Sequence, residues 1–222
     1  MTAADEAWGR AAVVDAARRL EALGLNQGTA GNVGLRIDDG LLVTPTGLPP
    51  AALDDDDVVA LDADGSVRAG QRRRPTSEWR LHAAVLAARP DVAAVVHTHS
   101  PEATAVSCLR RSLPAVHYVV AWTGRPAVPC ADYATYGSAE LAANVVAALG
   151  EGGACLMANH GLVTVGPSLD RAVALAVDVE WLARVHRLAV AQGEPVVLSD
   201  DEIARVAERF RAYGQPDPAA EA

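Results

Sequence analysis

Apolar side chains recur every three or four residues in several segments, which is the spacing of one face of an α-helix. The first such segment, residues 5–23, is followed by Gly24, a residue type that often ends a helix. Its apolar positions are Ala12, Val13, Ala16, Leu20 and Leu23. The same spacing, with Ser77 and Ser138 as possible caps, predicts further helices at residues 77–88, 138–150, 169–192 and 200–213.

Shorter apolar runs rich in valine, isoleucine and leucine predict strands between these helices. Residues 33–37 and 41–43 are joined by Asp38-Asp39-Gly40, a sequence typical of a tight hairpin turn. Further strands are expected at residues 58–61, 92–97, 115–120, 154–157 and 162–165. A hairpin within a mixture of helices and strands predicts an α/β fold with a mixed or antiparallel sheet covered by helices.

Composition narrows the class of protein. A chain of 222 residues and 23.0 kDa fits one substantial domain. Because 50% of its residues are hydrophobic and 21% are charged, the composition excludes a generally disordered protein. The formal net charge of −9 argues against binding to a nucleic-acid backbone. No apolar run approaches the roughly 20 residues that span a bilayer, so we expect no membrane partner.

The beginning of the sequence and its cysteines bear on the compartment. The first residues, Met-Thr-Ala-Ala-Asp-Glu, lack the basic and apolar regions of a signal peptide. The three cysteines, at positions 108, 130 and 155, are odd in number and widely spaced, so neither a disulfide framework nor a cysteine zinc site is indicated. We therefore expect a cytoplasmic protein.

Three of the six histidines occupy unusual positions. His97 and His99 close an apolar strand, and side chains two apart on a strand point to the same side. His160 lies in a turn between two predicted strands. Three neutral imidazoles that meet at strand ends would suit a catalytic zinc ion with a free fourth position. The alternative, histidines packed or solvated without metal, stays open, and His82, His117 and His186 are interpreted in that way.

Glu78 and three loops carry the remaining candidate chemistry. Thr76 and Ser77 precede a predicted helix, where hydroxyls and free amides can bind an anion, and Glu78 follows them. Residues 28–32 and 44–47 combine glycines with threonine hydroxyls. Each segment alone is explained as a helix cap or turn, and none matches a P-loop or dinucleotide fingerprint. Together they could form a nest of donors for a phosphate group.

Taken together, these motifs resemble the class II aldolase/adducin family. The resemblance extends from about residue 23 to residue 214, so we expect a class II aldolase domain at residues 1–214 and a flexible tail at residues 215–222. The motifs are Gly-Thr-Ala-Gly-Asn-Val (28–33), Thr-Pro-Thr-Gly (44–47), Pro-Thr-Ser-Glu-Trp-Arg (75–80), Val-Val-His-Thr-His (95–99) and Asn-His-Gly-Leu (159–162). The resemblance implies an α/β/α sandwich with a largely antiparallel sheet, assembled as a homotetramer with active sites between subunits.

The resemblance also implies roles for individual residues. The implied metal ligands of one Zn²⁺ per subunit are Glu78, His97, His99 and His160. The implied phosphate-binding residues are Gly31, Asn32, Thr46, Gly47, Thr76 and Ser77. The implied catalytic residues are Glu78, Tyr118 from a neighbouring subunit and Tyr213, and the implied aldehyde pocket contains Tyr136, Phe210 and Tyr213.

The chain contains no lysine, since all 19 basic residues are arginine, and this excludes an aldolase that works through a lysine Schiff base. The resemblance implies a metal-dependent lyase that cleaves L-fuculose 1-phosphate, or a closely related deoxyketose 1-phosphate, into dihydroxyacetone phosphate and a short aldehyde. Alternatives within the family are a 5-deoxypentulose-phosphate aldolase, a pentulose-phosphate 4-epimerase and a dehydratase. A more distant alternative is a non-catalytic, adducin-like interaction domain.

Overall fold

The computed structural model of the protein describes residues 3–213, and the tail expected at residues 215–222 lies outside this range. A seven-stranded sheet forms the centre, with the strand order β3-β2-β1-β4-β9-β8-β7. Its strands are β1 (Asn32–Ile37), β2 (Gly40–Val43), β3 (Val59–Asp62), β4 (Ala94–Thr98), β7 (Cys130–Ala131), β8 (Ala154–Met157) and β9 (Gly161–Gly166). All neighbours are antiparallel except β7 and β8, which confirms the predicted mixed, largely antiparallel sheet.

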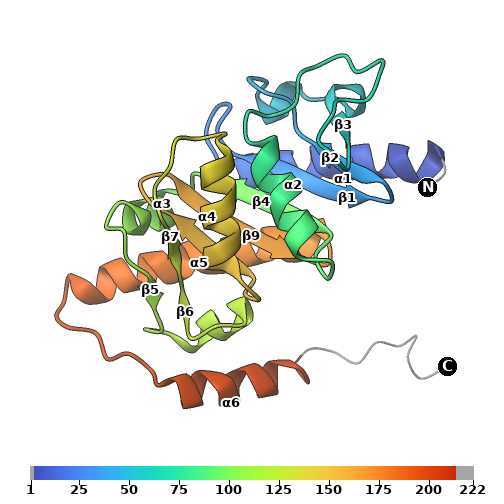
Figure 1. Ribbon diagram of the computed structural model, residues 1–222. Coiled ribbons are helices and arrows are strands. Elements are labelled where there is room, and N and C mark those ends of the chain that lie inside the picture. The colour runs from blue at the N-terminus through green and yellow to red at the C-terminus, as the bar shows by residue number, and fades with distance from the viewer. Residues whose placement is uncertain (1–2, 214–222) are drawn as a thin grey trace.

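Helices cover both faces of this sheet (Figure 1). The α-helices are α1 (Ala3–Ala22), α2 (Trp79–Ala88), α3 (Pro101–Ser107), α4 (Ala139–Leu149), α5 (Leu169–Val190) and α6 (Asp200–Phe210). Three short 3₁₀ helices lie at Pro50–Ala52, Asp55–Asp57 and Tyr118–Thr123, and β5 (Leu113–Pro114) pairs with β6 (Ala127–Val128) outside the main sheet. The α1 and α6 helices lie close to the ranges that apolar spacing predicts.

Alternation along the strands separates two hydrophobic cores. In β4, Ala94 and Val96 belong to the core shared with α1, α3 and α5, whereas Val95 belongs to the core shared with α2 and α4. In β8, Leu156 and Met157 divide in the same way. Because successive side chains on a strand point to opposite faces, this pattern produces the three-layer α/β/α sandwich.

One predicted strand is wrong, and one helix starts later than expected. Residues 115–120 do not form a strand, because the 3₁₀ helix Tyr118–Thr123 takes up much of this segment. The His117 ring accepts a hydrogen bond from the backbone N–H of Val119, and Gly124 ends the turn with a left-handed φ of 74°. This local capping outweighs the strand preference of the apolar run. The helix expected at residue 77 begins at Trp79.

Across residues 3–213, none of the helices combines the length and the apolar character that a membrane span requires.

Candidate metal centre and its cavity

The three histidines of interest meet at one end of the central sheet. His97 pairs with Asn32 of β1 in the antiparallel register, and His99 follows two residues later on the same side. His160 ends the turn that joins β8 to β9, and β9 is the other neighbour of β4. One ring nitrogen from each histidine lies within 4.8 Å of the others, and the ring centroids are 4.8 to 5.0 Å apart.

A backbone hydrogen bond fixes the ring of His97. Its Nδ1 lies 3.0 Å from the carbonyl oxygen of Leu162, and since a carbonyl only accepts, Nδ1 must donate. When this ring is neutral, its Nε2 atom carries the lone pair, as in many metal-bound histidines. This Nε2 lies 3.0 Å from the Nε2 of His99 and 3.2 Å from the Glu78 carboxylate. Such a set of facing lone pairs suits a shared cation.

The Glu78 carboxylate lies between these rings and the amide of Asn32. Asn32 Nδ2 donates a hydrogen bond of 2.9 Å to Oε2. The other oxygen, Oε1, is buried without a hydrogen-bond partner among the described residues, 3.5 Å from His160 Nε2. A buried acceptor normally has a partner, so a carboxylate oxygen facing three imidazoles fits a divalent cation such as Zn²⁺.

Charge states at this site also favour metal ligation. Burial opposes ionisation of Glu78, but His97, His160 and the Asn32 amide outweigh it and hold the pKa of this carboxyl below its ordinary value. Burial, together with the charge of His97, lowers the pKa of both His99 and His160 to about 4. These two imidazoles are therefore neutral at pH 7, and only a neutral imidazole binds a metal ion.

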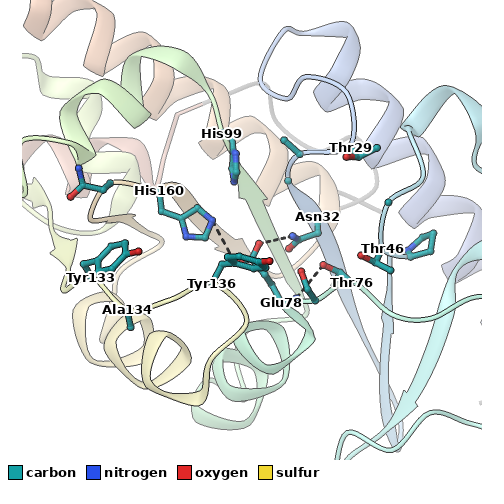
Figure 2. A pocket seen from close by; sticks show the side chains of 16 residues that line it. Thr29, Asn32, Thr46, Thr76, Glu78, His99, Tyr133, Ala134, Tyr136 and His160 are labelled. Carbon is teal, nitrogen blue, oxygen red and sulfur yellow. Dashed lines mark hydrogen bonds and ion pairs between the residues drawn. The ribbon is translucent and has the colours of Figure 1, made fainter.

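A cavity of about 340 Å³ opens in front of this cluster (Figure 2). Its walls contain Glu78, His99 and His160. They also contain all six residues expected to bind phosphate, namely Gly31, Asn32, Thr46, Gly47, Thr76 and Ser77. Three of the four candidate metal ligands and all of the candidate phosphate residues therefore share one cavity within a single chain.

Backbone pairing brings two of the predicted anion-binding loops together. Thr76 N–H donates to the carbonyl of Thr44 at 2.9 Å, and Thr46 N–H donates to the carbonyl of Arg74 at 3.1 Å. Gly31 and Gly47 have φ angles of 73° and 70°, which other residues rarely adopt. None of the described residues that line the cavity is an arginine, so its candidate anion-binding groups are neutral hydroxyls and amides.

Ser77 does not act as the helix cap that its position suggests. Glu78 occupies the N-cap position of α2, without a side-chain cap hydrogen bond. The Thr76 hydroxyl instead accepts a hydrogen bond from the backbone N–H of Glu78 at 3.3 Å. The Glu78 carboxylate is therefore free of a capping role and turns toward the histidines.

The aromatic residues expected for catalysis and for the aldehyde pocket are divided between two places. Tyr136 lines the cavity, as Figure 2 shows, whereas Tyr118, Phe210 and Tyr213 do not. These three belong to a surface group that we call the aromatic cluster, which consists of His117, Tyr118, Trp122, Trp181, Phe210 and Tyr213. Phe210 of α6 stacks on Trp122 at 4.0 Å, yet Tyr118 and Tyr213 are 47% and 76% exposed.

Two further residues support the site and were not expected from the sequence. His82 is fully buried, which agrees with a packed rather than a solvated histidine, and its Nε2 lies 2.5 Å from Asn32 Oδ1. Burial lowers the pKa of His82 to about 3, so its neutral ring orients the amide that holds Glu78. The sequence does contain a signal for this position, because His82 follows Glu78 by four residues, which is about one helical turn. Asn26 accepts a hydrogen bond from His99 N–H at 3.0 Å, a contact with no local sequence signal.

Comparison with known proteins shows the family to which the chain belongs. Residues 11–187 match the model of the family described as Class II Aldolase and Adducin N-terminal domain. The 5-methylthioribulose-1-phosphate/5-deoxyribulose-1-phosphate aldolase of Rhodospirillum rubrum is 47% identical over 205 residues, covering 92% of each chain. The L-fuculose phosphate aldolase of Escherichia coli (strain K12) is 46% identical over 203 residues, covering 91% of this chain and 94% of the relative.

A solved structure gives the same result for the fold. A chain described as L-fuculose 1-phosphate aldolase superposes with a TM-score of 0.90 and 35% identity, covering 95% of this chain and 98% of that one. The similarity of fold therefore extends over nearly the whole chain.

Proposed function

The chain belongs to the class II aldolase and adducin family and is a class II aldolase, and on this premise we propose that it cleaves L-fuculose 1-phosphate reversibly into dihydroxyacetone phosphate and L-lactaldehyde. One observation carries the proposal: a carboxylate, three imidazoles and a neutral donor cradle converge on one cavity. A ketose 1-phosphate has its phosphate next to its carbonyl, so it presents one group to each half of that cavity.

A second substrate class is favoured by a specific observation. The Rhodospirillum rubrum relative, 47% identical, is named for 5-methylthioribulose 1-phosphate and 5-deoxyribulose 1-phosphate. Cleavage of these ketoses also releases dihydroxyacetone phosphate, so the same cradle would serve. The candidate substrates differ in the aldehyde half, where this chain contributes Tyr136 to its own cavity.

His97, His99, His160 and Glu78 would hold one Zn²⁺ per subunit. When bound, this ion supplies Lewis acidity that draws electron density from the substrate carbonyl. The buried, unsatisfied Oε1 of Glu78 and the fixed tautomer of His97 support this ligand set. Glu78 would also have a second role, which is proton transfer to and from the substrate carbon.

The remaining residues bind, orient and move protons. The phosphate cradle would consist of Gly31, Asn32, Thr46, Gly47, Thr76 and Ser77. By binding the phosphate, it would hold the ketose in the orientation that the reaction requires, which lowers the entropic part of the barrier. In condensation, the Glu78 carboxylate would remove a proton from the hydroxymethyl carbon of dihydroxyacetone phosphate. Cleavage is the same step in reverse, in which the Glu78 carboxyl gives that proton back to the same carbon.

The aldehyde half would be completed by a neighbouring copy in a homotetramer. Tyr118, Phe210 and Tyr213 lie outside the cavity of their own chain, and two of them are largely exposed. In condensation the Tyr118 hydroxyl would donate its proton to the aldehyde oxygen, and in cleavage the Tyr118 phenolate would take the proton of the substrate C4 hydroxyl, with Tyr213 as a second catalytic group at the same side. Exposed aromatic side chains of this kind are typical of interfaces between proteins.

One experiment tests metal dependence and substrate class together. We expect a chelator to abolish the release of dihydroxyacetone phosphate and added zinc to restore it. With zinc, we expect a higher kcat/KM for L-fuculose 1-phosphate than for 5-deoxyribulose 1-phosphate. Full activity in the metal-free protein would remove the metal from the mechanism. Faster cleavage of the deoxyribulose substrate would select the second candidate, and a C4 epimer or dehydrated product would select another family reaction.

A further inference from the structure

Two residues of the structure share an unusual backbone conformation. Within residues 3–213, the non-glycine residues with positive φ are Arg110 and Asn159, each at 53°. Asparagine tolerates this left-handed region, but a long side chain such as arginine rarely adopts it. Although 49 positions separate them, Arg110 Nε donates a hydrogen bond of 2.7 Å to Asn159 Oδ1. Paired outliers of this kind often occur at functional sites.

The end of α3 holds the same turn through two more hydrogen bonds. Asn159 N–H donates to the carbonyl of Ser107 at 3.1 Å. His160 N–H donates to the Ser107 hydroxyl at 3.3 Å, and Ser107 is fully buried. Three bonds from residues 107–110 therefore converge on two residues of the β8–β9 turn, and the second of these residues is the candidate metal ligand His160.

Arg110 also reaches the other wall of the cavity. Its guanidinium carbon lies 5.6 Å from the ring centroid of Tyr133, within the range of a cation–π contact. Tyr133 lines the cavity, and so does Asn159, as part of the turn. A single side chain therefore links the loop after β7 to the turn after β8, without lining the cavity itself.

We propose that Arg110 is a positioning residue for the metal site. It holds Asn159 in the left-handed conformation, and this conformation directs the His160 ring toward His97 and Glu78. The inference rests on the proposed metal-dependent function, because it concerns the affinity of that site for zinc. Without Arg110, the exposed Asn159 amide would bind water instead, and the turn would be able to relax and shift the ring.

The adjacent Arg111 provides a matched control. It carries the same charge at the next position and is exposed, like Arg110. Arg110→Ala and Arg111→Ala therefore change the net charge equally, but only the first removes the bond to Asn159. A difference in zinc affinity between these two variants is therefore caused by the contacts of Arg110 and not by the loss of one positive charge.

Zinc affinity of the full-length protein is measured by competition with a chromophoric chelator, and the site geometry by the visible spectrum after substitution with Co²⁺. We expect Arg110→Ala to bind zinc about 10-fold more weakly, as found for other supporting contacts of metal ligands, and to alter the cobalt spectrum. Arg111→Ala should match the unchanged protein in both measurements. Equal affinities and equal spectra for the two variants would overturn the inference.

Asn159→Gly supplies a second and independent arm. Glycine adopts the positive φ without strain but lacks the side-chain carbonyl, so the bond to Arg110 is lost. If both substitutions act through that bond, the variant that combines Arg110→Ala with Asn159→Gly has the same zinc affinity as whichever single variant binds zinc less tightly. A loss of zinc affinity in the double variant equal to the product of the two single losses would overturn the inference. Failure of the unchanged protein to bind zinc would overturn the proposed function as well, which distinguishes the two failures.

Discussion

The cavity and the aromatic cluster differ in how much of each is complete within one chain. The cavity has its carboxylate, its imidazoles and its donor loops already in contact through hydrogen bonds such as Asn32 to Glu78. The aromatic cluster instead presents Tyr118 and Tyr213 on the surface, without lining that cavity. In Figure 1 the α6 helix at one side of the molecule lies far from β1 and β2. This difference supports the proposal that one chain would prepare the half that binds dihydroxyacetone phosphate and that a neighbouring copy would provide the aldehyde half.

The largest expected effect belongs to the cavity. Glu78→Gln should lower both ketose cleavage and the exchange of the carbon-bound proton of dihydroxyacetone phosphate by about 10²- to 10⁴-fold, because both reactions need the same proton transfer. Cleavage is followed by aldehyde release and exchange by NMR in heavy water. Glu140→Gln, an exposed acid at the start of α4, serves as the control and should change neither rate. Normal exchange in Glu78→Gln would exclude this carboxylate as the base.

A smaller and selective effect is expected from the aromatic cluster. Tyr118→Phe should slow cleavage by about 10²-fold, since one proton transfer to the aldehyde half is lost. The same variant should retain proton exchange in dihydroxyacetone phosphate, which needs only the cavity. Equal losses in the two assays would contradict the division between the regions.

Mixing these two inactive variants tests whether the regions come from different subunits. In a closed ring of copies, roughly a quarter of the interfaces would combine an intact Glu78 with an intact Tyr118. Activity should therefore reappear after the variants are dissociated and reassembled together. Persistent inactivity of verified mixed assemblies would show that Tyr118 does not serve a neighbouring site.

The smallest effect concerns stability rather than rate, and it arises behind the cavity wall. The pKa of His82 is about 3 in the folded protein, against an ordinary value of 6.5 in the unfolded chain. Between these values the unfolded chain binds the extra proton, so the free energy of unfolding falls as the pH drops below 6.5. Relative to His82→Gln, the unchanged protein should lose about 1.4 kcal/mol per pH unit between pH 6 and 4. The free energy of unfolding of both proteins is measured by denaturant titration at each pH. The same pH dependence in both would contradict the assignment of this effect to His82.

Much of the fold was predictable because local sequence agrees with its environment. Residues 154–157 form β8 over the range that their apolar run predicts, and the alternation around His97 and His99 correctly places the two side chains on one face. Residues 115–120 were not predictable from hydrophobicity, because a side-chain cap at His117 and a left-handed Gly124 favour a 3₁₀ helix. Apolar runs report burial, but they do not report local hydrogen bonds that compete with a strand.

The candidate site was predictable as a set of residues but not as a network. The sequence motifs point to His160 and Glu78, yet the contact between Asn32 and Glu78 spans 46 positions and depends on the packing of α2 against β1. The contribution of Arg110 depends on a backbone angle, which no residue type in its vicinity encodes. His82 is the exception, since its distance of one helical turn from Glu78 is visible in the sequence.

The absence of arginine from the described walls of the cavity has a consequence for turnover. Hydroxyls and backbone amides recognise a phosphate ester through the direction of their dipoles, and they do not neutralise its negative charge. Dissolved ions compete weakly with such dipoles, whereas they strongly screen pairs of opposite charges. A cradle of this type would hold dihydroxyacetone phosphate in one orientation without retaining it tightly, so that selectivity and rapid product departure would be compatible.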